Sequence, residues 1–178
     1  ATTASTPAAT ATSAGQRIEI RTDVLHAVID TRGGNLVEAD LLAYPLDPSD
    51  RSKPVHLLSD TGEGFFVAQT GLVSSASPAP DHKAPFNAEK TDYALADGAD
   101  TLEVPLTWTD ASGLTVRKVY IFKRASYLID TREEVTNASS SPWTGNEYRQ
   151  LQRVPPVIKS SGFAFSDPER FAFAGIAD

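Results

Sequence analysis

The sequence predicts an all-β chain folded as an antiparallel β-sandwich, and three observations carry this prediction. Apolar residues recur with a period of two in almost every segment from residue 16 onward, which is typical of strands with one buried face. Clusters of Gly, Pro, Asn, Asp and Ser separate these segments, as turns between neighbouring strands do. No segment has the apolar spacing of a helix of three or more turns. Strands joined by turns, without helices to cover a sheet, favour two sheets packed face to face.

The composition limits the classes of function. A chain of 178 residues, 40% hydrophobic and 22% charged, is long enough for one domain with a substantial core. Its net charge of −7 argues against binding to nucleic acid, whose phosphates need a basic surface. The absence of cysteine excludes disulfides, thiol catalysis and thiolate metal sites. Methionine is absent as well, even at position 1, so we expect a piece of a longer protein.

Residues 1–15 differ in composition from the rest of the chain. They contain only Ala, Thr, Ser, Pro, Gly, and so lack the large apolar side chains that would offset the entropy of ordering them. They also lack the basic and apolar regions of a signal peptide. We interpret residues 1–15 as a disordered linker that joins an upstream anchor to a folded domain over residues 16–178. A disordered terminus without a role is the alternative.

The folded domain opens with residues 18–44, which read as strand, strand, tight turn and strand. The turn covers residues 31–35, where Gly33 and Gly34 supply the positive φ that a tight hairpin turn needs. The segment before the turn is apolar on both of its faces. We therefore expect this strand to be covered on both sides.

Prolines and polar clusters divide the next part of the chain. Residues 44–48 contain two prolines and are expected to break the sheet, and residues 49–54 are expected to form a polar loop. The other expected elements are short strands at 55–58 and 65–70, a long surface excursion over 72–85, and a brief pairing at 93–95.

The clearest hairpin joins residues 102–109 to residues 114–123. Its first strand alternates apolar and polar residues, and the side chains predicted to face the core are Leu102, Val104, Leu106 and Trp108. Pro105 lies inside this strand, which predicts either a sheet edge or a bulge. Further strands are expected at 127–136 and 144–154.

Side chains that could carry chemistry are scattered. The histidines, His26, His56 and His82, have no carboxylate at the spacing of a metal site or a catalytic pair. Glu133 and Glu134 are adjacent, so they face opposite sides of a strand and are interpreted as solvated charges rather than a paired acid and base. We therefore predict no catalytic residue, no metal site and no cofactor, and a protein that is not an enzyme.

Several segments are informative when they are taken together. They are Thr22–Leu25, Asp30–Gly34, Leu41–Pro45, Phe86–Lys90, Leu102–Leu106, Thr109–Ala111, Phe122–Arg124 and Leu151–Pro156. In their residues, order and spacing they resemble the first part of the periplasmic domain of the YidC/Oxa/Alb family of bacterial membrane protein insertases. The resemblance covers nearly all of the chain outside the linker.

The resemblance implies a large β-sandwich, a supersandwich like that of galactose mutarotases, here truncated at residue 178. It implies a place in the periplasm, between a first transmembrane helix and the membrane core of an inner-membrane protein. That core carries the insertase activity of the family, which inserts and folds inner-membrane proteins alone or with the Sec translocon. The part over residues 16–178 would then be a non-catalytic interaction or spacing module.

The resemblance also implies partners. Nascent inner-membrane proteins would bind the membrane core, and the SecDF accessory complex is associated with the later part of the periplasmic domain. Residues 162–175 place four phenylalanines around an Asp-Pro turn. If exposed, they would form a partner patch; they are Phe163, Phe165, Phe171 and Phe173. A hairpin with stacked aromatic pairs is the alternative.

A second class of function is a carbohydrate-binding or mutarotase-like, sugar-active protein on the same fold. Trp108 and Trp143 could stack on a sugar, although core or interface positions are the more ordinary use of tryptophan in a β-protein. Mutarotases need a histidine and a glutamate that converge on the sugar, and the sequence offers no such pair.

The truncation predicts a physical consequence. Half of a supersandwich would expose apolar sheet faces and unpaired strand edges, and such edges recruit other strands. We therefore expect this fragment to associate with itself, or to need the missing half as its partner.

Overall fold

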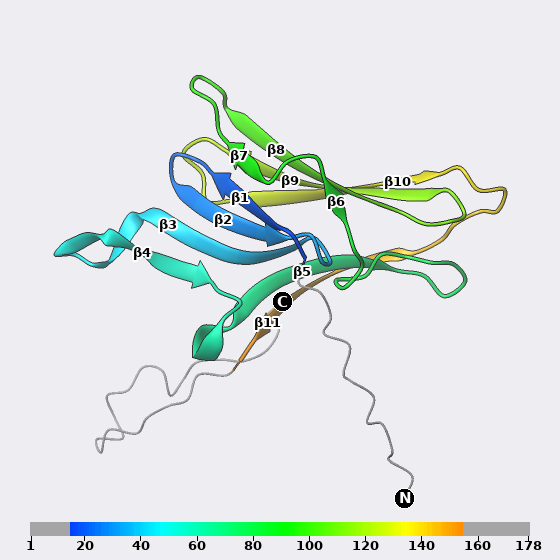
Figure 1. Cartoon of the computed structure of the whole chain (residues 1–178), viewed down its shortest axis with the longest axis horizontal. Coiled ribbons are helices and arrows are strands. Elements are labelled where there is room, and N and C mark those ends of the chain that lie inside the picture. Colours follow the sequence, from blue (N-terminus) through cyan, green and yellow to red (C-terminus); the bar gives the residue numbers. More distant parts are fainter. Residues whose placement is uncertain (1–14, 155–178) are drawn as a thin grey trace, which may run out of the picture.

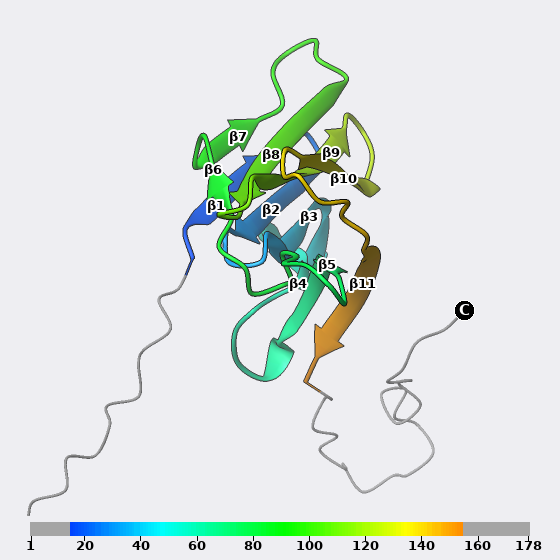
Figure 2. The same cartoon turned by 90° about the vertical axis from the view of Figure 1, so that its right-hand side faces the viewer.

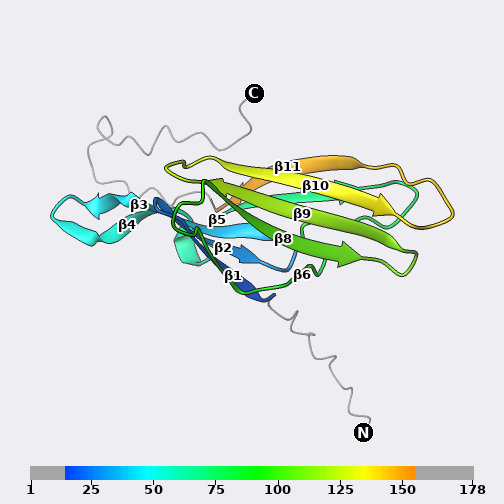
Figure 3. The ribbon, with the colours of Figure 1, turned by 90° about the horizontal axis from the view of Figure 1, so that it is seen from above.

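The computed structural model describes residues 15–154, which form two β-sheets packed face to face (Figure 1). The seven-stranded sheet has the order β11-β5-β3-β2-β1-β7, with β4 paired to β3, and the four-stranded sheet has the order β10-β9-β8-β6. Figure 3 looks down on the smaller sheet, with the larger one behind it. The predicted β-sandwich is therefore confirmed. No helix of the described residues is both long and apolar enough to span a bilayer.

The large sheet contains β1 Arg17–Arg21, β2 Leu25–Asp30, β3 Asn35–Asp47, β4 Asp50–Leu58, β5 Phe66–Val73, β7 Asp92–Ala94 and β11 Asn146–Arg153. The small sheet contains β6 Asn87–Ala88, β8 Thr101–Thr109, β9 Leu114–Lys123 and β10 Ile129–Asn137. A 3₁₀ turn, η1 Gly62–Gly64, precedes β5. The strands predicted from period-two alternation all lie within one to three residues of the observed ones, apart from β4 and the end of β3.

The opening hairpin has the predicted tight turn. Gly33 and Gly34 have φ values of 78° and 58°, in the left-handed region that glycine enters without a Cβ clash. A side chain at Gly33 would collide with the carbonyl of His82, and the Gly33 N–H donates to the carbonyl of Ala84 at 2.7 Å. The turn therefore needs glycine both for its conformation and for its close approach to the following loop.

The core lies between the sheets and follows the predicted alternation. From the large sheet it receives Ile18, Ile20, Leu25, Ala27, Ile29, Leu36, Ala39 and Leu58. From the small sheet it receives Val104, Leu106, Tyr120 and Phe122, with Leu102 and Trp108 packed at its margin. Burial of these apolar side chains is the main force that holds the two sheets together.

The expectation that β2 is covered on both faces is correct for only part of the strand. Val28 lies on the outer face, in a small second cluster with Val37 and Val67. His26, on the same face, instead contacts carboxylates. The outer face of the large sheet is therefore apolar near Val28 and polar near His26.

The predicted break at residues 44–48 and the polar loop at 49–54 are wrong. β3 continues to Asp47 and β4 begins at Asp50, so the two strands form a hairpin arm that projects beyond the sandwich (Figure 1). Pro45 and Pro54 are opposite each other in this arm, and the pairing shifts register on both sides of Pro45. Prolines are tolerated in such an irregular two-stranded ribbon because it does not need a complete ladder of N–H donors.

Two further expectations change in the structure. β5 extends to Val73, and Pro80 in the loop that follows is fully buried, so the predicted surface excursion runs partly through the interior. β7 pairs in parallel with β1, which makes one exception to the antiparallel meander. Pro105 lies at a sheet edge, as predicted, because β6 pairs only with Leu106 and Thr107 beyond it.

Candidate functional site

The most deeply buried charge of the described residues is Lys118, in the middle of β9. Its side chain is 0% exposed, and Nζ donates to the carbonyls of Gly33 at 2.8 Å and Thr70 at 2.9 Å. Nζ also lies 3.6 Å from Oε1 of Glu133 and 4.9 Å from the ring centroid of Phe86. Lys118 thereby joins the small sheet to the β2–β3 turn and to β5 of the large sheet.

Burial lowers the pKa of Lys118 from 10.5 to about 8, against the opposing effect of the Glu133 carboxylate. Tyr120 lies two residues further along β9, on the same face of the strand, and donates to the carbonyl of Gly34 at 2.6 Å. Burial raises the pKa of Tyr120, so its hydroxyl stays a neutral donor. These side chains bind backbone groups of the opposite sheet, which identifies them as an internal joint between the sheets rather than a reactive site.

The two adjacent glutamates of β10 differ in burial and in their partners. They face opposite sides of the strand, as predicted, and Glu134 is exposed with ion pairs to Arg117 at 3.1 Å and Arg132 at 2.8 Å. The Glu133 side chain is only 4% exposed and accepts a hydrogen bond from the Thr70 hydroxyl at 3.1 Å. The interpretation of both as solvated charges is therefore wrong for Glu133, whose partner Lys118 belongs to the neighbouring strand.

A second polar group crosses the outer face of the large sheet. We call it the histidine row, and its members are Glu19 of β1, His26 of β2, Asp40 of β3 and His56 of β4. Asp40 is the direct cross-strand partner of both His26 and His56. Its Oδ2 lies 3.1 Å from Nδ1 of His26 and its Oδ1 lies 2.6 Å from Nδ1 of His56. Oε2 of Glu19 lies 2.7 Å from Nε2 of His26.

In the histidine row, His26 and His56 have carboxylate neighbours, although none stands at the sequence spacing of a metal site or a catalytic pair. Their partners are 7, 14 and 16 residues away along the chain and meet them only through strand pairing. Partial burial lowers the pKa of His26, but the hydrogen bonds and charges of Asp40 and Glu19 outweigh it and hold that pKa above its ordinary value of 6.5. The row therefore favours a charged imidazole at position 26.

Shallow hollows lie on either side of the histidine row. A hollow of about 320 Å³ beside His26 also has Arg21, Asp92 and Tyr93 in its walls. Another of about 300 Å³ beside His56 is walled by Glu38 and Thr61, among others. No group of three or more His, Asp or Glu side chains within residues 15–154 is arranged to hold a metal ion.

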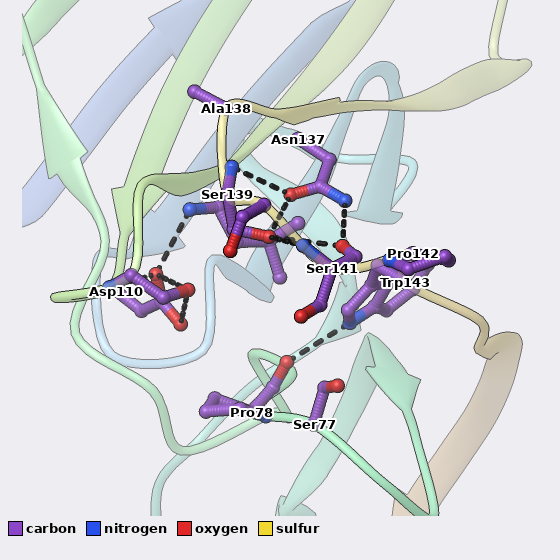
Figure 4. A pocket seen from close by; sticks show the side chains of 12 residues that line it. Ser77, Pro78, Asp110, Asn137, Ala138, Ser139, Ser141, Pro142 and Trp143 are labelled. Atoms are coloured by element: carbon purple, nitrogen blue, oxygen red, sulfur yellow. Dashed lines mark hydrogen bonds between the residues drawn. The ribbon is translucent and has the colours of Figure 1, made fainter.

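A further hollow lies at one end of the sandwich, where three loops meet (Figure 4). It has a volume of about 420 Å³, and its walls include Asp110, Asn137 and Trp143. The Asp110 carboxylate accepts hydrogen bonds from Ser112 and from the Leu114 N–H, and the Trp143 indole donates to the Pro78 carbonyl at 3.1 Å. These polar groups stabilise the turns that form the hollow.

The remaining predicted residues fall in three places. His82 contacts the hydroxyl of Tyr148 at 2.6 Å, and Trp108 packs at the core margin, as expected for a structural tryptophan. The proposed partner patch lies outside the described residues; its members are Phe163, Phe165, Phe171 and Phe173. Sequence reasoning missed Lys118, although the alternation contained the signal, since Lys118 shares the inward-facing positions of Val116 and Tyr120.

Comparison with known proteins places the chain in a family. The YidC periplasmic domain family matches residues 17–175. The chain is 49% identical over 142 residues to the membrane protein insertase YidC of Methylococcus capsulatus, covering 80% of this chain and 26% of that protein. It is 41% identical over 169 residues to that of Thioalkalivibrio sulfidiphilus, covering 91% and 29%. It is 40% identical over 141 residues to that of Alkalilimnicola ehrlichii, covering 79% and 25%.

The chain thus spans between a quarter and three-tenths of the length of these relatives. The match runs through every strand described above, from the opening hairpin to β11. The expected resemblance to the insertase family is confirmed. The chain belongs to the YidC periplasmic domain family.

Proposed function

We propose that this chain is the N-terminal part of the periplasmic domain of an inner-membrane protein insertase, preceded by a linker over residues 1–15, and that it acts as a non-catalytic interaction or spacing module. The observation that carries the proposal is the family match over residues 17–175, together with relatives that are named membrane protein insertases. The parent protein would insert and fold inner-membrane proteins, alone or with the Sec translocon. Its membrane-embedded part would bind the nascent substrates.

The arrangement of polar groups supports a scaffold role. Lys118 and Tyr120 donate hydrogen bonds to backbone carbonyls of the opposite sheet, and the Asp110 carboxylate accepts hydrogen bonds within its own turn. Groups bound in this way stiffen a fold and are not available to polarise a substrate.

The sugar-active alternative gains no support from the histidine row. His26 does lie beside a glutamate, Glu19, but both of its ring nitrogens already contact carboxylates. A catalytic histidine must keep one nitrogen free for the substrate. In the hollow walled by Trp143, the Asp110 carboxylate and the Trp143 indole are already bonded within the loops that form it.

The experiment is a deletion in the full-length parent. The segment corresponding to residues 16–154 is replaced by a flexible Gly/Ser linker, and insertion of a model membrane protein is measured by protease protection in inverted vesicles. A spacing or interaction module predicts that a substrate inserted without the Sec translocon is still inserted. Loss of this insertion, at a normal level of the parent in the membrane, would overturn the proposal.

A second measurement tests SecDF as partner. Phe163→Ala and Phe171→Ala in the full-length parent are expected to reduce co-purification with SecDF, because truncated aromatic side chains bury less apolar area at an interface. Leu46→Ala, on the exposed β3–β4 arm, is the control and should leave SecDF binding unchanged. Unchanged binding in both phenylalanine variants would remove these residues from the contact.

A further inference from the structure

The histidine row lies where the β3–β4 arm joins the large sheet. The pairing of β3 with β4 shifts register between Ala39 and Asp40 and again between Leu41 and Pro45. The backbone ladder is therefore irregular on both sides of the Asp40–His56 pair. At this position the side-chain contact of 2.6 Å between Asp40 and His56 links the arm to the sheet.

The protonation state of His26 decides which bonds the row can form. Carboxylates only accept hydrogen bonds, and Nδ1 and Nε2 of His26 each contact one, from Asp40 at 3.1 Å and from Glu19 at 2.7 Å. A neutral imidazole has one N–H, whereas the imidazolium has two. Both contacts are hydrogen bonds at the same time only when His26 is protonated.

The charges around the row favour that protonated state. Asp40 faces His26 from β3, Glu19 faces it from β1, and Asp92 of β7 lies in the wall of the same hollow. Arg21, the direct partner of His26 on β1, opposes protonation, and Tyr93 is the other titratable neighbour. On the far side of Asp40, His56 faces Asp40 itself, with Glu38 in the adjoining hollow.

We propose that the histidine row is a proton-operated clamp, in which protonated His26 fixes Asp40 in place and Asp40 in turn holds His56 and the base of the β3–β4 arm. Loss of the proton from His26 leaves it one donor for two carboxylates. Asp40 and Glu19 then compete for that donor, and the side-chain support of the arm weakens. The arm carries the exposed side chains of Tyr44 and Leu46, so the clamp controls how firmly the domain presents them.

The test is an NMR titration of the imidazole nitrogens in the full chain, from about pH 5 to about pH 9. The chain has three histidines, so single His→Gln variants assign the signals. The midpoint of His26 is expected to fall in Asp40→Asn and in Glu19→Gln, because each change removes one carboxylate acceptor. Asp130→Asn, which removes the exposed partner of Lys123 on the other sheet, is the matched control and should leave the midpoint unchanged.

A second readout follows the arm itself. Backbone amide signals of β4 are followed in a His56→Gln background, so that protonation of His56, which lies in β4 itself, does not move them. In this background they are expected to shift with the same midpoint as His26, and to lose that transition when His26→Gln is added. Glu19 is half exposed, so Glu19→Gln keeps the test open if a change at Asp40 or His26 impairs folding. A His26 midpoint that is the same in Glu19→Gln and the wild type, or β4 amides that do not follow it, would overturn the proposal.

Discussion

At the scale of single residues, the most deeply buried charge of the described residues is Lys118, in the middle of the core. Lys118 gives up its hydration to bind two carbonyls and the Glu133 carboxylate, and the apolar part of its side chain packs in the core. Such a buried pair costs a large desolvation energy, so its stabilising effect depends on every partner being present. Removing Lys118 or Glu133 alone is therefore expected to lower the free energy of unfolding by more than the intact pair raises it.

Lys118→Ala is expected to lower the free energy of unfolding by about 3–5 kcal/mol, because it leaves Glu133 buried without its partner. Lys123→Ala changes another lysine of β9 and removes its exposed ion pair with Asp130 of β10, so it should cost about 0–1 kcal/mol. Urea denaturation measures both. The double variant Lys118→Met, Glu133→Gln should recover part of the loss; equal losses in the two lysine variants would contradict the role of Lys118.

The pKa of Lys118 also predicts how stability depends on pH. Because its pKa is about 8 in the folded chain and 10.5 when unfolded, the unfolded chain binds more protons between these values. The free energy of unfolding should therefore rise with pH from about 8 to about 10 in the wild type, relative to Lys118→Met. Above that range Tyr120 opposes the trend, since its pKa is raised by folding. Urea unfolding across this window measures the difference, and parallel profiles would contradict it.

At the scale of elements, the β2–β3 turn connects several parts of the molecule. Its carbonyls receive Lys118 and Tyr120 from the small sheet, and the Gly33 N–H reaches the loop after β5. The conformation of this turn therefore affects how the two sheets pack together, in addition to closing the β2–β3 hairpin. The β3–β4 arm is the opposite case, since it projects from the sandwich (Figures 1 and 3), and Tyr44 on the arm contacts Tyr127, with 5.6 Å between their ring centroids.

Gly33→Ala is expected to destabilise the chain by about 2 kcal/mol or more, because the new methyl group meets the His82 carbonyl in addition to the strain of a positive φ. Gly98→Ala is the matched control. Gly98 has a φ of 76° but no atom within 4 Å of an added Cβ, so only the conformational cost of about 1 kcal/mol applies. Thermal unfolding compares the two, and equal costs would show that the close approach does not matter.

At the scale of the whole molecule, the sandwich formed by residues 15–154 has an edge strand of each sheet on the same side. β10 and β11 are the last strands of their sheets and lie on the same side of the molecule (Figures 2 and 3). Both strands carry exposed apolar side chains, among them Val135 and Leu151, and Leu151 is 67% exposed. Among residues 15–154 no further strand pairs with these two edges, and edges with unpaired backbone groups and apolar side chains are a template for further strands.

We expect the 178-residue chain to associate with itself through this side at micromolar concentration. Light scattering after size exclusion should give a mass above 19.0 kDa that falls towards it in Leu151→Lys, since a charge on an edge strand opposes pairing. Leu46→Lys, on the arm, serves as control and should leave the association unchanged. A monodisperse wild-type monomer with cooperative melting would contradict the prediction.

The sequence by itself determined the β class, the positions of most strands, the Gly33–Gly34 turn and the family, because period-two alternation and turn residues are local signals. It misled at Pro45 and Pro54, where an irregular ribbon tolerates what a regular ladder excludes. Only the tertiary structure decided the partners of charged residues. Lys118 and Gly33 are 85 residues apart, and His56 reaches Asp40 across a register shift, so strand pairing rather than sequence spacing brings these groups together.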